Sequence, residues 1–160
     1  MDYMIGVDLG TTSTKSVLFD LKGHIIASSS KGYPLYRDKP DMAEEDPVEI
    51  FEALIDSLTD VVRAGKLEND DKILGVSFSS AMHSLIAFDK DWKPLTRVIT
   101  WADGRAFKYS EQLKESGVGQ KIYSKTGTPI HPMAPLSKLL WLKNEQQDIY
   151  KKSKHFLGIK

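Results

Sequence analysis

The sequence contains no cysteine, which excludes a disulfide framework, a cysteine-ligated metal and a thiol nucleophile. It also carries no net charge, because 22 acidic residues balance 22 basic ones, so its overall charge favours neither nucleic acid nor an acidic membrane surface as a partner. No apolar run approaches the roughly 20 residues of a membrane span, and no basic segment followed by an apolar one suggests a signal peptide. We therefore expect a cytoplasmic protein that binds neither nucleic acid nor membrane.

The composition that remains is that of an ordinary globular protein. Of the 160 residues, 41% are hydrophobic and 28% are charged, which is enough apolar material for a core. This length favours a single domain.

The first turn of the chain has the most distinctive pattern. Two apolar runs, Met4–Asp8 and Lys15–Phe19, indicate two β-strands joined by a short loop of glycine and hydroxyl residues. Gly10 lets the backbone turn and lets a ligand come close. The loop residues that offer hydroxyls and backbone N–H groups to an anion are Thr11, Thr12 and Ser13.

Two charged residues flank this loop. Asp8 can hold a hydrated Mg²⁺ ion, which takes only one or two carboxylates from a protein, and Lys15 supplies a cation nearby. Such a set suits the phosphates of a nucleotide with its metal, although the Walker A pattern is absent. From the residues alone, an ordinary hairpin with a polar turn remains an equal alternative.

The rest of the first half predicts one more strand and a long helix. His24–Ser30 reads as a third strand, so the three strands form an antiparallel meander, and Met42–Glu45 continues the irregular segment that follows. Asp46 is expected to cap a helix that ends at Gly65 in the C′ position. Its expected inward side consists of Phe51, Leu54, Ile55, Leu58, Val61 and Val62.

The second half predicts alternating strands and helices. Ile73–Ser79 is expected to be a buried strand. Two further strand segments are expected at Leu85–Phe88 and His155–Ile159. Asp103 can cap a helix that stops at Gly117, and Gln120–Ser124 is expected to form a short helix. The remaining helix starts at Pro135, with Leu136, Leu139, Leu140 and Trp141 expected inward. This order indicates an α/β fold, with a mixed sheet of antiparallel and parallel strands flanked by helices.

Several segments together resemble a known family. IGVDLGTTSTKSVLFD resembles the first phosphate-binding segment of sugar kinases with the actin-like ATPase, or ribonuclease H-like, fold. The segments Ser79–His83, Thr100–Arg105 and Pro135–Leu142 narrow the resemblance to the FGGY carbohydrate kinases. Within that family, Thr126–Met133 looks most like the gluconate kinases, with the xylulose kinases as the nearest alternative.

The resemblance implies an ATP-dependent kinase that uses Mg²⁺ to phosphorylate a hydroxyl of an open-chain sugar acid, converting gluconate to 6-phosphogluconate. The alternatives are a xylulokinase-type enzyme acting on a ketose, and a non-catalytic module that only binds sugar. A homodimer of the full-length protein is compatible with the resemblance.

The resemblance also assigns roles to residues. Asp8 would be the catalytic and metal-binding carboxylate, and the phosphates would contact Gly10, Thr11, Thr12, Ser13 and Lys15. The sugar would contact Met82, His83, Trp101, Asp103 and Arg105. The residues themselves leave simpler roles open: a buried structural histidine for His83, a core aromatic for Trp101, a helix cap for Asp103 and a surface cation for Arg105.

One departure from the family is large. Family members are much longer and carry a second domain with the adenosine site and the general base. We therefore expect residues 1–160 to be a truncated N-terminal, sugar-binding domain that is inactive alone, with its general base outside this chain.

Overall fold

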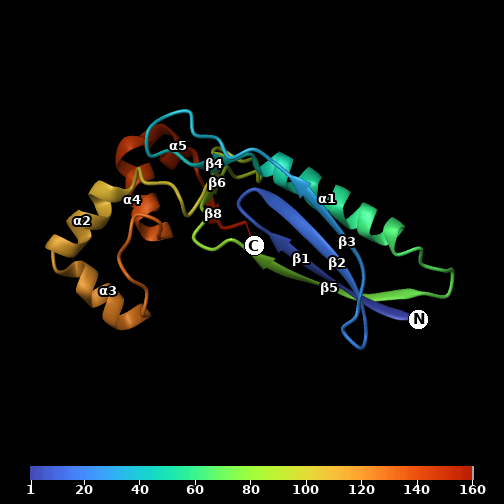
Figure 1. Ribbon diagram of the computed structural model, residues 1–160. Helices are drawn as coiled ribbons and strands as arrows, with labels where there is room; N and C mark the ends of the chain where they lie inside the picture. Colours follow the sequence, from blue (N-terminus) through green and yellow to red (C-terminus); the bar gives the residue numbers. More distant parts are fainter. Residues whose placement is uncertain (160) are drawn as a thin grey trace. The chain divides into compact units, whose positions relative to one another are not determined.

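A computed structural model describes residues 1–159 and divides them into two compact units. The first unit consists of residues Met1–Leu35 and Asp46–Ala81, and the second of Tyr36–Glu45 and Met82–Ile159. Both units combine strands with helices, so the expected α/β class is confirmed (Figure 1).

The first unit is built on a four-stranded sheet in the order β3-β2-β1-β5. Neighbours β1 and β2, and β2 and β3, are antiparallel, whereas β5 runs parallel to β1. The expected meander followed by a parallel strand is therefore confirmed. The strand bounds are Asp2–Leu9 for β1, Ser13–Asp20 for β2, Ile25–Gly32 for β3 and Lys72–Ser80 for β5.

One helix, α1 (Pro47–Ala64), covers one face of this sheet and packs against β2 and β3 (Figure 1). Asp46 is its N-cap, as predicted, and accepts a hydrogen bond from the Val48 N–H at 2.8 Å. The predicted inward side is wrong in part, because Phe51 and Ile55 are exposed. Val61 is buried as predicted, and the other buried residues of the helix are Ile50, Ala53 and Ser57.

The small residues on this inward side explain the difference. Small side chains let a helix approach a sheet closely, and the hydroxyl of Ser57 lies 2.7 Å from that of Ser16 on β2. Both serines are completely buried. The larger Phe51 and Ile55 therefore lie on the outer side of α1, whereas apolar periodicity alone predicted them on the inner side.

Gly65 ends α1 as predicted, but for another reason. It has right-handed geometry (φ −69°), and the left-handed residue is Lys66, with a φ of 49°. A Cβ atom on Gly65 would lie 2.5 Å from the Leu18 Cδ2 atom of β2. A larger residue here would force the Leu18 side chain to shift, so close packing, and not the C′ conformation, favours glycine.

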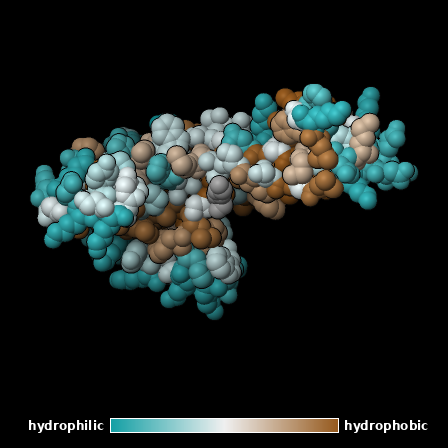
Figure 2. Space-filling model, turned by 90° about the horizontal axis from the view of Figure 1, so that it is seen from below, coloured by the Kyte–Doolittle hydropathy of each residue, from teal (hydrophilic) through white to brown (hydrophobic). Residues whose placement is uncertain are grey.

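The prediction that Ile73–Ser79 forms a buried strand is wrong in its burial. The strand exists as β5, but it lies at the edge of the sheet, where Val76 and Phe78 are each 43% exposed. Helix α1 packs against β2 and β3, so it leaves the apolar side chains of β5 uncovered. Figure 2 shows apolar residues in brown gathered on this part of the surface.

The second unit contains two short sheets and four helices. Strand β4 (Glu44–Glu45) pairs with β7 (Val98–Ile99), so the loop predicted at Met42–Glu45 is partly wrong. Strand β6 (Ile86–Phe88) pairs with β8 (His155–Leu157), which confirms both predicted segments. Leu85, Ile99 and Leu142 form its apolar core. The helices are α2 (Phe107–Glu115), α3 (Val118–Thr126), α4 (Pro135–Glu145) and α5 (Gln147–Lys152).

Two details of these helices differ from the predictions. Helix α2 begins after Ala106, so Asp103 is not its cap. Helix α4 starts at Pro135 as expected, but Leu136 is exposed and the fully buried positions are Ser137, Lys138 and Leu142. Helix α5 was not predicted. No helix within residues 1–159 is both long and apolar enough to cross a bilayer.

Candidate functional site

The first unit places an acidic and a basic side chain side by side at the end of β1. In the sheet, Asp8 lies opposite Lys15 of β2 on one side and Ser79 of β5 on the other. These three residues help to line a shallow concavity of about 310 Å³, whose walls include Phe19 and Phe78. Asp8 and Lys15 are exposed, and the Asp8 carboxylate makes no hydrogen bond or salt bridge to another residue in 1–159. Both charges are therefore accessible to a ligand.

The turn next to Asp8 is held in one conformation by its own backbone and by Tyr33. The Gly10 N–H donates to the Ser13 carbonyl oxygen at 3.0 Å, and a Cβ atom on Gly10 would lie only 3.0 Å from that oxygen. The Tyr33 hydroxyl donates to the Gly10 carbonyl at 2.6 Å, and its N–H donates to the Thr12 carbonyl at 3.1 Å. The turn is thus preorganised, and Tyr33 is a support that the sequence did not indicate.

The fit of a metal ion can be judged from the same residues. Within the described part of the chain, no group of three or more histidine, aspartate or glutamate residues is placed to hold a metal by itself. Mg²⁺ that arrives with phosphates keeps several waters and needs only one or two carboxylates. Asp8 fits such a shared site, and it does not fit a site made of protein ligands alone.

The second unit presents His83 and Trp101 on two loops. His83 is half-buried and has a left-handed backbone with a φ of 65°, a conformation in which histidine is found more often than most residues. The preceding Met82 is 73% exposed and Trp101 is 49% exposed. Apolar and imidazole groups accessible to solvent on these loops are suited to contact a small polar ligand.

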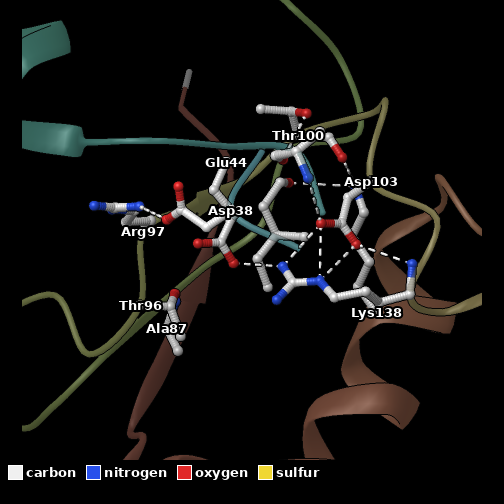
Figure 3. Close-up of polar contacts among 11 residues, drawn as sticks. Asp38, Glu44, Ala87, Thr96, Arg97, Thr100, Asp103 and Lys138 are labelled. Carbon is white, nitrogen blue, oxygen red and sulfur yellow. Dashed lines mark hydrogen bonds and ion pairs between the residues drawn. The ribbon is translucent and has the colours of Figure 1, made fainter. Parts of the chain in front are cut away.

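Both loops are joined to helix α4 by Lys138. Its side chain is completely buried, and its ammonium group donates hydrogen bonds to three backbone carbonyls. The acceptors are the carbonyl oxygens of His83, of Thr100 at 2.7 Å and of Ile99 at 3.3 Å. Figure 3 labels Lys138 and Thr100 in this region. Burial lowers the pKa of Lys138 to about 8, although the negative charge of Asp103 acts in the opposite direction. Three carbonyl acceptors match the three protons of the ammonium form.

Asp103 and Arg105 hold each other in place. The Asp103 carboxylate accepts hydrogen bonds from the Arg105 Nε at 2.9 Å and from the Ala43 N–H at 3.0 Å. Arg105 also forms a salt bridge with Glu44 (Figure 3). Its guanidinium lies over the Trp141 ring at 4.3 Å. Burial alone would lower the pKa of Arg105, but the bonds to Asp103 and Glu44 outweigh it and raise that pKa. This network fixes the segment that carries Trp101.

Sequence reasoning missed two members of this region. Lys138 could have been noticed, because it is an isolated cation inside the apolar run of Pro135–Leu142. Glu44 offered no such signal, since its partner Arg105 is 61 residues away in the chain.

The comparisons with known proteins agree with this architecture. The model of the FGGY family of carbohydrate kinases, N-terminal domain, matches residues 3–160. The chain belongs to this family. Its similarity to solved FGGY kinases confirms the expected actin-like ATPase fold.

Individual members of the FGGY family show how close the likeness is. A gluconokinase from Bacillus subtilis is 49% identical over 99% of this chain and 30% of its own length. The crystal structure of a gluconate kinase from Lactobacillus acidophilus is 47% identical, with a TM-score of 0.93 over 99% of this chain and 31% of its own. A ligand-bound xylulose kinase structure from the same organism is 46% identical, with a TM-score of 0.94 over 99% of this chain and 32% of that one. The FGGY domain described here thus spans about 30% of the length of the curated gluconokinase.

Proposed function

We propose that this chain is the N-terminal, sugar-binding domain of an ATP-dependent carbohydrate kinase whose substrate is gluconate. The observation that carries the proposal is the exposed Asp8–Lys15 pair beside a rigid Gly10 turn, in a chain of the FGGY family. Phosphoryl transfer asks a protein mainly for positioning and charge neutralisation, and these residues offer both.

On the phosphate side, Asp8 would hold the Mg²⁺ that accompanies ATP, and Lys15 would contribute a positive charge. Thr11, Thr12 and Ser13 would donate hydrogen bonds to phosphate oxygens, as successive backbone N–H groups in a turn do. Gly10, whose own N–H already donates to the Ser13 carbonyl, would let the phosphates approach the backbone closely. Bound Mg²⁺–ATP would supply the phosphoryl group and neutralise its charge. We place the general base in a second domain, outside residues 1–160.

On the sugar side, Met82, His83 and Trp101 are the proposed direct contacts, because all three retain accessible surface. The side chain of Arg105 is 19% exposed, and its guanidinium is the proposed contact for a substrate carboxylate. The side chain of Asp103 is only 1% exposed and already accepts hydrogen bonds from Arg105 and Ala43. We therefore replace the direct sugar contact expected of Asp103 with a supporting role.

Gluconate is favoured over xylulose by the 49% identity to a gluconokinase, and by the resemblance of Thr126–Met133 to gluconate kinases. Xylulose is the second candidate, because a structure named as a xylulose kinase is 46% identical to this chain. Both substrates are open-chain polyhydroxy compounds, so the same loops suit either of them.

The test is an assay of the complete protein, obtained by extending the reading frame beyond Lys160. With ATP and Mg²⁺ it is expected to phosphorylate gluconate in preference to xylulose, and residues 1–160 alone are expected to show no activity. Asp8→Asn should lower kcat by about 100-fold or more, because it removes one group that stabilises charge in the transition state. Asp2→Asn, an exposed aspartate on the same strand, is the matched control.

Three results would count against the proposal. Preference for xylulose would overturn the substrate, and full activity of Asp8→Asn would overturn the role of the turn. A complete protein that binds a sugar acid in calorimetry but never phosphorylates it would support the non-catalytic binding module instead.

A further inference from the structure

Lys138 places a charged group in the protein interior, where it binds the backbone of two short loops. Placing an ammonium group in a protein interior is costly unless each of its protons is hydrogen-bonded. Lys138 is completely buried, and all three acceptors are backbone carbonyls of the segments that lead into His83 and Trp101. An apolar side chain would fill this position at lower cost if packing were the only requirement.

We propose that Lys138 is a positioning residue for sugar binding, which fixes the backbone of the His83 loop and of the Thr100–Trp101 segment against helix α4. This inference rests on the proposed function, because it concerns the same site. Lys138 itself is buried beneath the loops, so it acts through His83 and Trp101 and not by touching the sugar.

The backbone of His83 shows why such a support is needed. A non-glycine residue in the left-handed region costs of the order of 1 kcal/mol or more, and it persists only where its surroundings determine it. The His83 carbonyl accepts a hydrogen bond from the Lys138 ammonium. This bond favours the conformation that presents the imidazole. Without it, the carbonyl would lose a charged partner and the loop could relax to an extended form.

The Trp101 segment has the same dependence. Thr100 also reaches Ala43, since both its N–H and its hydroxyl donate to the Ala43 carbonyl, at 3.1 Å and 2.9 Å. The Thr100 carbonyl accepts a hydrogen bond from the Lys138 ammonium. Ile99 is already paired with Leu85 in the backbone, so its long bond to Lys138 at 3.3 Å adds less. The His83 and Thr100 carbonyls are therefore the two functional connections.

The test uses the complete protein with three substitutions. Lys138→Met keeps the length of the side chain and removes its donors, and Lys138→Arg keeps the charge but changes the geometry of the donors. Lys143→Met, on the exposed side of the same helix, is the matched control. Steady-state kinetics would give KM for the sugar acid and KM for ATP separately, and circular dichroism would confirm folding.

We expect Lys138→Met to raise the KM for the sugar acid by about tenfold or more, because misplacing contact groups by a fraction of an ångström has effects of this size. The KM for ATP should change by less than about twofold, since the phosphate turn belongs to the other unit. Lys138→Arg should show a smaller change of the same kind, and Lys143→Met none.

A folded Lys138→Met protein with the wild-type KM for sugar would overturn the inference, even if its melting temperature fell. Should Lys138→Met fail to fold, Lys138→Arg decides: a selective rise in the sugar KM supports the positioning role, and an unchanged KM refutes it. A wild-type protein without sugar kinase activity would refute the proposed function and this inference with it. An active wild type with insensitive variants would refute the inference alone.

Discussion

Glu45 offers a stringent test of the energetics of the second unit. It lies on β4 opposite Val98 and is 2% exposed, and its Oε1 atom has no hydrogen-bond partner among the described residues. Burial raises the pKa of Glu45 from the ordinary 4.5 to about 7. The perturbation is Glu45→Gln, which keeps the shape of the protonated side chain and cannot ionise.

The sign of the effect follows from which state binds the proton more tightly. Between pH 4.5 and about 7 the folded protein keeps the Glu45 proton while the unfolded chain loses it, so the free energy of unfolding falls as the pH rises. One pKa unit corresponds to about 1.4 kcal/mol, so the change from 4.5 to about 7 corresponds to about 3 kcal/mol. Glu45→Gln should therefore be more stable than the wild type by up to about 3 kcal/mol at pH 8, and nearly equal to it at pH 4.5.

The assay is urea unfolding of the purified protein at several pH values from 4.5 to 8.5. The control is Glu115→Gln, an exposed glutamate at the end of α2, which should shift stability by less than about 0.5 kcal/mol at every pH. A stability difference between wild type and Glu45→Gln that stays constant across this range would refute the reasoning, because no proton linkage would then exist at Glu45.

Three further substitutions test separate parts of the structure. Gly65→Ala should destabilise the first unit by about 1–3 kcal/mol in thermal unfolding, since its Cβ would collide with Leu18. Asp103→Asn should cost about 3 kcal/mol in the same assay, because Arg105 would lose the buried one of its two carboxylate partners. Asp8→Asn, in contrast, should leave the free energy of unfolding within about 0.5 kcal/mol of the wild type, because its carboxylate is exposed.

Each of these expectations has a contrary outcome. A Gly65→Ala protein as stable as the wild type would mean that Leu18 has room to move, and the close approach of α1 would lose its explanation. Full stability of Asp103→Asn would show that Glu44 alone suffices to hold Arg105. A large loss of stability in Asp8→Asn would reveal a structural role for the proposed ligand.

The local predictions that succeeded depended on short-range signals. The cap at Asp46 and the helix start at Pro135 follow from rules that involve only a few neighbouring residues. The first strand pair followed from apolar runs on either side of a turn. In each of these cases the residues that interact are close together in the sequence.

Several of the predictions that failed concerned burial. Phe51 and Ile55 fit the helical period no worse than the buried residues do. The close contact between Ser57 and Ser16 determines which side of the helix is buried. β5 is as apolar as a buried strand, yet its position at the sheet edge leaves it exposed. Periodicity identifies an apolar face, and only the neighbouring elements decide whether that face is covered.

The sequence by itself determined the family, the mixed α/β fold and the turn from Asp8 to Lys15, because those patterns are local and ordered along the chain. The tertiary structure decided which residues support the His83 loop and the Thr100–Trp101 segment. Lys138 reaches carbonyls 38 to 55 residues away, and Arg105 meets Glu44 across 61 residues. Such partners have no spacing rule, since folding alone brings them together.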